Sequence, residues 1–406
     1  MGKKTFLPYG KQSIDEDDVA AVLKVLNSDW LTTGPAVEKF ESCLTERVGA
    51  AHGIACSNGT AALHLAAMAL DLEPGDYVVV PAITFLSTAN AIRYVGAEVL
   101  FSDVDPDTGL MRAEDLEAAL DAHPEKPVRA VFPVHLAGQA VDLPKISTIA
   151  KERDLVVIED ACHALGTTYQ DTDGKEYAVG GCRHSDMAIF SFHPVKTLTT
   201  GEGGMITLNH SGMADRLKLL RNHGMVREAD EFINEDLAFD ISGTKNPWYY
   251  EMWEFGFNYR LTDIQCALGI SQLGKLDEFI QRRRELVDLY YQGLLGKAPG
   301  IKPLRRRSNV KPSWHIFPAL IDFDAFQVER SAVMNKLSSA GIGSQVHYIP
   351  VCHQPYYRRR YGYRNLAGAD EYYRRTLTLP LYASMSDGDV ELILSKLYGI
   401  FGLSPP

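Results

Sequence analysis

The sequence predicts an α/β protein built around a largely parallel sheet. Over the first 230 residues, short continuous apolar runs alternate with stretches that have helical periodicity. Continuous rather than alternating apolar runs are typical of strands that helices cover on both faces. The chain has 406 residues, of which 46% are hydrophobic and 23% charged, so its size and composition allow two or three domains with a large core.

The first half of the chain supplies most of the predicted elements. The stretch Ser13-Ile14-Asp15-Glu16 predicts a capping box at the start of the first helix. The apolar positions Val19, Val22, Leu23 and Leu26 follow it at helical spacing and predict one apolar face. Further helices are expected at 61–70, 113–122 and 143–153, and strands at 77–80, 130–134, 155–158, 188–190 and 205–208.

The second half begins with a change in composition. Residues 228–254 are acidic and aromatic without a sustained period, which predicts a long loop that is functional rather than disordered. A long helix is expected after Thr262 as its N-cap, with Ile264, Leu268, Leu273 and Leu276 on its apolar side. The remainder predicts a smaller α+β domain with strands at 316–323 and 345–349 and helices at 329–340 and 387–398. We therefore expect one large domain over 1–262, and a linking helix with a small domain over 263–406.

Charge and cysteine usage exclude several classes of protein. The net charge of −11 argues against a nucleic-acid-binding surface, which needs excess Lys and Arg. The six scattered cysteines show neither a metal-site spacing nor a disulfide framework, so they fit a reducing compartment. Met1–Pro8 has no apolar leader, and no run of 18 apolar residues occurs. We expect a cytoplasmic protein that binds no membrane, no nucleic acid and no metal.

The most specific segment for chemistry surrounds Lys196. It follows a short apolar strand and precedes Thr199-Thr200-Gly201-Glu202-Gly203-Gly204, and no acidic residue lies within five positions of it. Lysine becomes a nucleophile towards carbonyl groups when burial lowers its pKa. A random loop lysine is usually only solvated, but these neighbours favour a reactive amine.

Asp160 and His163 form a second candidate pair. Asp160 ends an apolar strand, and ligands bind at that edge of open parallel sheets. A carboxylate there could keep a pyridinium nitrogen protonated, as the pyridoxal cofactor requires. His163 could stack on or hydrogen-bond to the same ring. A helix N-cap for Asp160 and a satisfied core histidine for His163 remain open alternatives.

Three further segments are suited to an anion or a ring. Gly59 and Thr60 open an apolar helix, whose free amides and dipole attract phosphate, although Thr60 could be only a cap. Phe85 follows a strand and could cover a cofactor ring, although a core phenylalanine is commoner. Asn258 and Arg260 precede another helix start.

In combination these segments resemble the DegT/DnrJ/EryC1/StrS sugar aminotransferases, which are fold-type I enzymes that depend on pyridoxal 5'-phosphate. The family's lysine motif is met by Ser191 to Gly204, its E-D-x-x-H/Q-A-x-G motif by Glu159 to Gly166, and its G-[YF]-N-x-R-[LM]-T-D-I-Q motif by Gly256 to Gln265. The resemblance implies an aspartate-aminotransferase-like large domain with a mainly parallel seven-stranded sheet, a smaller C-terminal α+β domain and a homodimer with shared active sites.

The same resemblance implies roles for single residues. Lys196 would bond to the cofactor and later shuttle a proton, while Asp160 would pair with the pyridine nitrogen and His163 would lie near the 3-hydroxyl. Phe85 would stack on the ring. Gly59, Thr60 and Ser191 would hold the phosphate, and Asn258 would reach the phosphate or substrate across the dimer interface.

The segments around Tyr9, Trp30–Thr32 and Gln345–Tyr348 are similar to those of particular family members. These members aminate the 4-keto group of a UDP-linked 4-keto-6-deoxy-N-acetylhexosamine on the route to pseudaminic acid. L-Glutamate, leaving as 2-oxoglutarate, is the donor that this similarity implies. Relatives acting on GDP- or TDP-linked sugars share the cofactor motifs, and a non-catalytic cofactor-binding regulator is a further alternative. Sugar 3-dehydratases of the same fold carry His where this chain has Lys196, which favours an aminotransferase. The residues implied to contact the nucleotide sugar are Tyr9, Trp30, Leu31, Thr32, Asn258, Gln345, His347 and Tyr348.

Overall fold

The computed structural model describes residues 6–404 and contains a seven-stranded sheet. Only β9 runs antiparallel to its neighbours β1 and β8, whereas the other paired strands are parallel, so the predicted mainly parallel α/β sheet is confirmed. Each of the seven strands contains at least two consecutive buried residues, as expected where helices cover both faces. In sheet order they are β1 (His52–Cys56), β9 (Gly204–Leu208), β8 (Met187–Ser191), β5 (Val156–Asp160), β4 (Val128–Val131), β2 (Tyr77–Pro81) and β3 (Glu98–Ser102).

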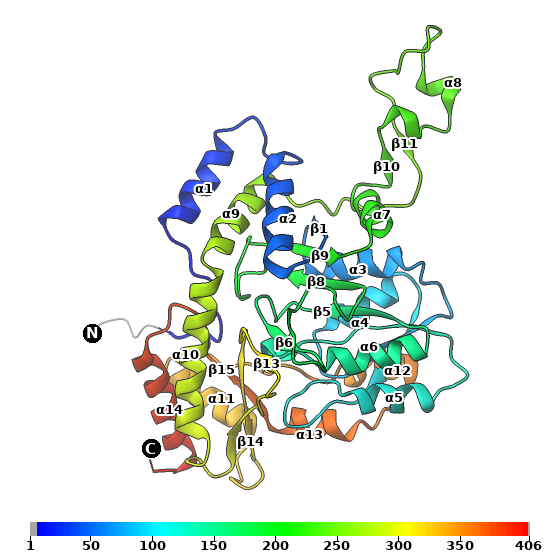
Figure 1. Ribbon diagram of the computed structural model, residues 1–406. Helices are drawn as coiled ribbons and strands as arrows, with labels where there is room; N and C mark the ends of the chain where they lie inside the picture. The colour runs from blue at the N-terminus through cyan, green and yellow to red at the C-terminus, as the bar shows by residue number, and fades with distance from the viewer. Residues whose placement is uncertain (1–5, 405–406) are drawn as a thin grey trace.

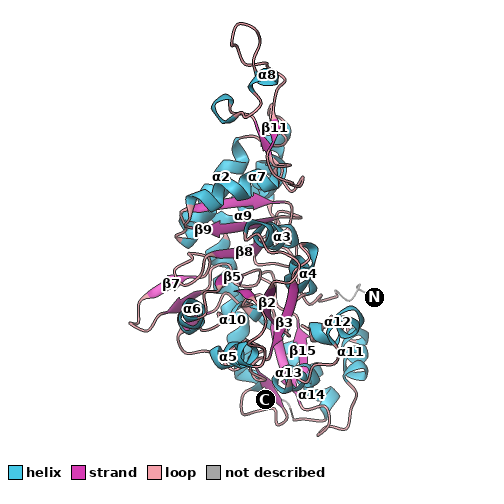
Figure 2. Ribbon diagram, turned by 90° about the vertical axis from the view of Figure 1, so that its right-hand side faces the viewer, coloured by secondary structure: helices cyan, strands magenta, loops and turns pink. Residues whose placement is uncertain are grey.

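Six helices pack on this sheet or beside it (Figures 1 and 2). α3 contacts β8 and β9, and nearly all of its residues are buried, which explains why its sequence is apolar all round. The helices are α2 (Pro35–Val48), α3 (Gly59–Ala69), α4 (Leu86–Tyr94), α5 (Ala113–Asp121), α6 (Leu143–Glu152) and α7 (Ser211–Arg221).

The first helix, α1 (Glu16–Leu26), begins two residues later than the predicted capping box requires. Asp15 is the N-cap, and its carboxylate accepts from the Asp18 N–H while the Asp18 carboxylate accepts from the Asp15 N–H, each at 3.1 Å. The predicted box from Ser13 to Glu16 is therefore wrong. The reason is tertiary, because Asp18 is buried against Gln272 and Lys275 and the cap forms around it.

The expected long helix after Thr262 is divided into α9 (Asp263–Gly274) and α10 (Leu276–Leu294), with non-helical backbone at Lys275. The Thr262 cap is confirmed as a capping box with Gln265. The predicted apolar side of α9 is only partly buried. Its fully packed face instead carries small residues, because α2 approaches so closely that a Cβ on Gly269 would lie 2.7 Å from the Phe40 ring.

The C-terminal part forms an antiparallel sheet of β12 (Ile301–Pro303), β14 (Phe317–Ile321) and β15 (Thr376–Leu379). The strand predicted at 345–349 does not form. Gln345 makes one bridge to Thr378, and the chain then turns into the large cavity described below. The helices here are α11 (Arg330–Ser339), α12 (Pro355–Tyr361), α13 (Ala367–Arg375) and α14 (Asp387–Phe401), and a small separate sheet joins β13 (Val310–Lys311), β6 (Thr168–Gln170) and β7 (Glu176–Ala178).

The region predicted as a long loop is a projecting arm (Figure 1). β10 (Met225–Val226) pairs with β11 (Glu251–Met252) at its base, and α8 (Glu235–Ala238) lies near its tip. Val226, Phe232 and Ala238 form a small core of its own, with the Tyr249 ring 4.9 Å from that of Phe232. The prediction of irregular structure missed this hairpin, because two-residue strands leave no recognisable period.

Among residues 6–404, no helix has the length and apolarity needed to cross a membrane. The first five residues, on which the expectation of no leader partly rests, lie outside the described residues. All six cysteines are free thiols.

Candidate active site

A cavity of about 1090 Å³ opens at the carboxyl ends of the parallel strands. The polypeptide leaves β1, β2, β5 and β8 at this edge, so segments far apart in the sequence meet there. Eleven of the residues that the sequence predicts for the site line this one cavity. They are Tyr9, Gly59, Thr60, Phe85, Asp160, His163, Ser191, Lys196, Gln345, His347 and Tyr348.

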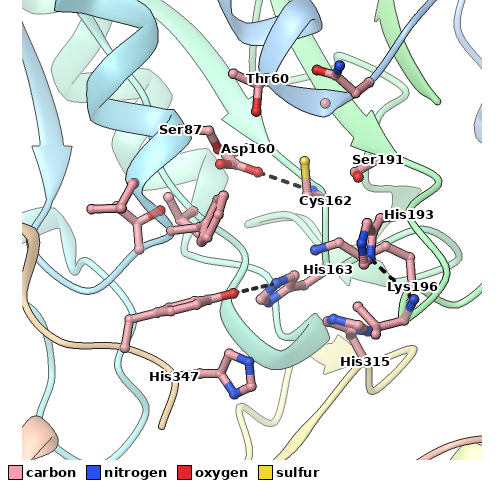
Figure 3. A pocket seen from close by; sticks show the side chains of 18 of the residues that line it. Thr60, Ser87, Asp160, Cys162, His163, Ser191, His193, Lys196, His315 and His347 are labelled. Carbon is pink, nitrogen blue, oxygen red and sulfur yellow. Dashed lines mark hydrogen bonds between the residues drawn. The ribbon is translucent and has the colours of Figure 1, made fainter. Parts of the chain in front are cut away.

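Asp160 is a buried carboxylate at the last position of β5 (Figure 3). Its Oδ2 accepts from the Thr88 hydroxyl at 2.7 Å, and its Oδ1 accepts from the Cys162 N–H at 3.2 Å. The Thr84 and Thr88 hydroxyls are in turn 2.7 Å apart. None of the described Lys, Arg or His side chains forms an ion pair with Asp160, so this buried charge still requires a cationic partner in the cavity.

The start of α3 forms a different wall of the cavity. Asn58 is the N-cap and accepts from the Ala61 N–H at 2.8 Å, while Gly59 and Thr60 occupy the first turn, whose amides lack intrahelical acceptors. A Cβ on Gly59 would lie 2.9 Å from the Ser191 Cβ, so only glycine permits this approach. Helix-start amides beside a serine hydroxyl suit a phosphate group.

Lys196 lies between these two regions, on the loop after β8. Part of its surface is open to the cavity, while protein atoms enclose the rest. This burial lowers the pKa of its amine, although the negative charge of Asp160 acts in the opposite direction. A lysine with a lowered pKa is a better nucleophile at neutral pH.

Three histidines and a tyrosine form a further cluster in the wall of the cavity. The Ala137 N–H donates to His163 Nδ1 at 3.3 Å, so a neutral His163 carries its proton on Nε2 and donates it to the Tyr348 hydroxyl at 3.1 Å. Burial lowers the pKa of His163 and His315 well below the usual value, and that of His347 to about 3, with the Lys196 charge adding to the effect in each case. These rings are therefore neutral at physiological pH.

Phe85 supplies an exposed aromatic face inside this polar cavity. It is 55% exposed, and its ring lies 6.1 Å from the Tyr348 ring. Tyr9 lies 5.5 Å from the His347 ring on the same side. An apolar ring exposed in a cavity is a typical surface for stacking against a planar ligand.

Four predicted residues lie outside this cavity. Trp30 and Leu31 are exposed beyond the end of α1, and Thr32 bridges to Thr262. Asn258 is exposed and bridges to Asn222. The structure thus does not bring them to Lys196 of the same chain.

Sequence reasoning missed several residues that shape the site. Thr84 and Thr88 gave no signal because their partner Asp160 is 72 residues beyond Thr88 in the chain. His315 directly precedes the strand predicted at 316–323 and gave no signal of its own, although its ring lies 4.4 Å from that of His163.

Comparison with known proteins places this geometry in a family. Residues 12–398 match the model of the DegT/DnrJ/EryC1/StrS aminotransferase family. The chain belongs to that family. SpsC of Bacillus subtilis, a spore coat polysaccharide biosynthesis protein, is 37% identical over 398 residues, which cover 97% of both proteins. The UDP-4-amino-4,6-dideoxy-N-acetyl-beta-L-altrosamine transaminase of Campylobacter jejuni is 36% identical over 394 residues, again 97% of both.

Solved structures of the family agree with the fold. Helicobacter pylori PseC, an aminotransferase of pseudaminic acid biosynthesis, has a TM-score of 0.86 at 28% identity over 98% of this chain and all of that one. The putative sugar aminotransferase Spr1654 of Streptococcus pneumoniae, solved in PLP and PMP forms, also has a TM-score of 0.86, at 29% identity over 98% of this chain. This family member is therefore a sugar aminotransferase of fold type I that uses pyridoxal phosphate.

The cavity fits that cofactor. The carboxylate of Asp160, which pairs with no cation from residues 6–404, matches a pyridinium nitrogen, and the Gly59–Thr60 turn with Ser191 matches a phosphate. Among residues 6–404, Lys196 is the only lysine that lines the cavity. The groups that line the cavity thus suit the chemistry of the cofactor.

Proposed function

We propose that the enzyme transfers the amino group of L-glutamate to the 4-keto carbon of a UDP-linked 4-keto-6-deoxy-N-acetylhexosamine. The product would be a UDP-4-amino-4,6-dideoxy sugar for a glycan of the pseudaminic acid type. The observation that carries this proposal is the meeting of Lys196 with the segment Gln345–Tyr348 in one cavity. The similarity to the altrosamine transaminase and to PseC supports the choice of sugar.

The roles proposed for the cofactor-binding residues follow from their chemistry. Asp160 would hold the pyridine nitrogen protonated, Gly59, Thr60 and Ser191 would bind the phosphate, Phe85 would cover the ring, and His163 would face the 3-hydroxyl. When bound, pyridoxal phosphate supplies an electron sink for the carbon that loses its proton. Every other step depends on groups of the chain.

Lys196 would move the proton. Its Nζ would accept the α-proton of the amino donor and return a proton on the same side of the cavity, because burial lowers the pKa of the amine and so favours its neutral form. The neutral His163 and His347 rings would not compete for that proton. Tyr9, Gln345, His347 and Tyr348 would orient the sugar nucleotide on the opposite side.

The proposal includes a homodimer, because a second copy of the chain would cover apolar residues that are exposed in the single chain. Val19, Leu23 and Leu26 of α1 are each about half exposed, so the apolar face predicted for this helix is not covered by its own chain. Trp30 and Leu31 continue the same surface. We assign Trp30, Leu31, Thr32 and Asn258 to the active site of the neighbouring subunit.

The test is amination of a panel of UDP-, GDP- and TDP-linked keto sugars with glutamate as donor. We expect 2-oxoglutarate and a 4-amino sugar from the UDP-linked 4-keto-6-deoxy-N-acetylhexosamine. Lys196→Ala should lower turnover by about 10³-fold or more, because no other lysine of the described part of the chain lines the cavity to replace it. Full activity of that variant, or amination of every sugar except the UDP-linked one, would contradict the proposal.

A second candidate is amination of a different nucleotide-linked keto sugar. It is favoured by one observation, namely that SpsC, a spore coat polysaccharide protein, is as similar to this chain as the altrosamine transaminase is. The same panel separates the two candidates, since this one predicts turnover with a GDP- or TDP-linked sugar.

A further inference from the structure

Glu159 is a buried acidic residue that the proposed chemistry does not use. It directly precedes Asp160 on β5, is 1% exposed, and does not line the large cavity. It pairs with no lysine or arginine of residues 6–404. Its Oε2 instead accepts from His135 Nε2 at 2.8 Å, and its Oε1 accepts from the Ser185 hydroxyl. Because a carboxyl group is costly to bury without hydrogen bonds, both contacts matter to the local structure.

His135 is held from both sides of its ring. It is completely buried, and the Val141 N–H donates to its Nδ1 at 3.2 Å. Nδ1 therefore carries no proton, and the proton on Nε2 is the one donated to Glu159. The ring cannot turn over without losing both hydrogen bonds, so the side chain has one orientation.

The backbone around His135 runs along the end of β5. The Asp160 N–H donates to the Pro133 carbonyl at 2.8 Å, and the His135 N–H donates to the Asp160 carbonyl at 3.1 Å. The side-chain bond to Glu159 is a third link at the same place. Together these links fix where the loop 135–138 begins relative to β5.

The loop 135–138 in turn contacts two histidines of the cavity. The Ala137 N–H donates to His163 Nδ1 at 3.3 Å, and the Ala137 carbonyl accepts from the His315 N–H at 2.9 Å. Gly138 has a φ of +95°, and a Cβ there would lie 3.1 Å from both the His163 carbonyl oxygen and the His315 nitrogen. The loop therefore has little room to move relative to either histidine.

We propose that Glu159 and His135 are positioning residues, which hold the loop 135–138 so that His163 keeps a single tautomer. A neutral imidazole can carry its proton on either ring nitrogen. The Ala137 N–H occupies Nδ1 of His163, so the proton stays on Nε2, which donates to the Tyr348 hydroxyl at 3.1 Å. The contacts thus lead from a carboxylate outside the cavity to a hydrogen-bond donor inside it.

The consequence for the cofactor rests on the proposed function, in which His163 faces the 3-hydroxyl group. The Nε2–H would then be a donor to that oxygen. A donor favours the ionised form of an oxygen, so its loss should raise the pH at which the absorbance band of the bound cofactor titrates. We expect a rise of about 0.5–1 pH unit, the equivalent of one hydrogen bond.

NMR of the histidine ring nitrogens in the holoenzyme measures the tautomer directly and does not depend on activity. The isotope label is placed in histidine only, and His163→Asn identifies the signals of His163 by their loss. In the wild type we expect His163 to be a single tautomer with the proton on Nε2. A mixture of tautomers, or a proton on Nδ1, would overturn the proposal.

Three variants separate positioning from stability. Glu159→Leu removes the acceptor for His135, so His163 should populate both tautomers and the cofactor band should titrate at higher pH. Glu159→Gln keeps an acceptor for His135 and should behave as the wild type. Ser185→Ala removes the other hydrogen bond of the same carboxylate, so it should lower the unfolding temperature without changing the tautomer.

The possible results are distinct. An unchanged His163 tautomer in folded Glu159→Leu would reject the positioning role. A changed tautomer with an unchanged cofactor band would support that role and would instead contradict the proposed place of His163 beside the 3-hydroxyl. If Glu159→Leu does not fold, His135→Phe breaks the same link from its other side, and the wild-type spectrum still decides.

Discussion

At Asp160, the orientation of one carboxylate depends on donors from two elements. The Thr88 hydroxyl comes from α4 and the Cys162 N–H from the turn after β5. The two donors bind different oxygens of the carboxylate, so together they fix the direction in which it points. Thr88 is completely buried, so water cannot replace its hydroxyl if it is lost.

Thr88→Val should therefore weaken the interaction between Asp160 and the cofactor ring. Loss of one hydrogen bond to a buried charge costs about 1–2 kcal/mol, which corresponds to about 5–30-fold weaker cofactor binding. Cofactor titration followed by absorbance measures the dissociation constant, and a pH titration of the same band reports the protonation of the bound ring. Thr88→Ser keeps the hydroxyl and is the matched control. Equal titrations for the Val and Ser variants would assign Thr88 a packing role only.

A residue of this site could be predicted when its sequence neighbours show its role, and could not when the role depends on a distant part of the chain. Lys196, Asp160 and His163 lie in short motifs that contain both the strand end and the functional group. The Thr84–Thr88 pair contributes through Asp160, which only the sheet order brings close to α4. No pattern of spacing around Thr88 encodes that contact.

Among the elements, β3 is joined to α12 and α4 through a single carboxylate. Glu98 accepts from Arg360 Nε at 2.8 Å and from the Tyr361 hydroxyl at 2.6 Å, and it pairs with Arg93 at 3.0 Å. The Arg360 side chain, together with Tyr361 and Arg93, lowers the pKa of Glu98 from 4.5 to about 2. This network attaches α12 to the edge of the large sheet.

Glu98→Gln should destabilise the enzyme in a way that depends on pH. A carboxylate whose pKa is lower in the folded state contributes stability above its unfolded value of 4.5 and loses it as pH falls towards 2. Urea unfolding should show a loss of about 1–2 kcal/mol at pH 7 that begins to shrink below about pH 4.5. Glu391→Gln, on the exposed side of α14, should have little effect at any pH. A loss for Glu98→Gln that is constant down to pH 3.5 would show that the charge does not contribute.

The elements themselves were predicted best where the core decides them. The runs at 77–80 and 205–208 became β2 and β9 almost residue for residue, because buried strands need continuous apolar sequence. The strand expected at 345–349 does not form, because its residues line the cavity and only Gln345 pairs with a strand. The hairpin structure of the arm within 228–254 was not predicted, because its few core residues are too sparse to produce a recognisable hydrophobic period.

Over the whole molecule, the net charge of −11 is a sum, and it does not show how two runs of basic residues, Arg305–Arg307 and Arg358–Arg360, pair with nearby acids. Arg305, Arg306 and Arg307 each pair with an aspartate, and Arg360 pairs with Glu98. Arg358 and Arg359 form no ion pair among the described residues and follow Gln354, which lines the large cavity. Of the two runs Arg305–Arg307 and Arg358–Arg360, only the second thus keeps arginines without an ion pair among the described residues.

The proposed homodimer with shared sites makes a prediction that only the whole assembly can test. We place Asn258 in the neighbouring subunit's site, because on its own chain it is exposed and outside the cavity of Lys196. Lys196→Ala and Asn258→Ala homodimers should each be nearly inactive. Mixing them by subunit exchange creates heterodimers with one doubly damaged site and one intact site, so activity should reappear.

The recovered activity distinguishes the two arrangements. If Asn258 acted within its own chain, each heterodimer site would still carry one lesion and mixing would restore nothing. With random exchange, about half of the molecules should be heterodimers with one working site each, which restores about a quarter of the wild-type rate per subunit, by the statistics of two-subunit assembly. Light scattering on the same samples checks the dimer, and a monomeric mass would remove the basis for sharing. Mixing Lys196→Ala with wild type is the control for dilution by inactive subunits.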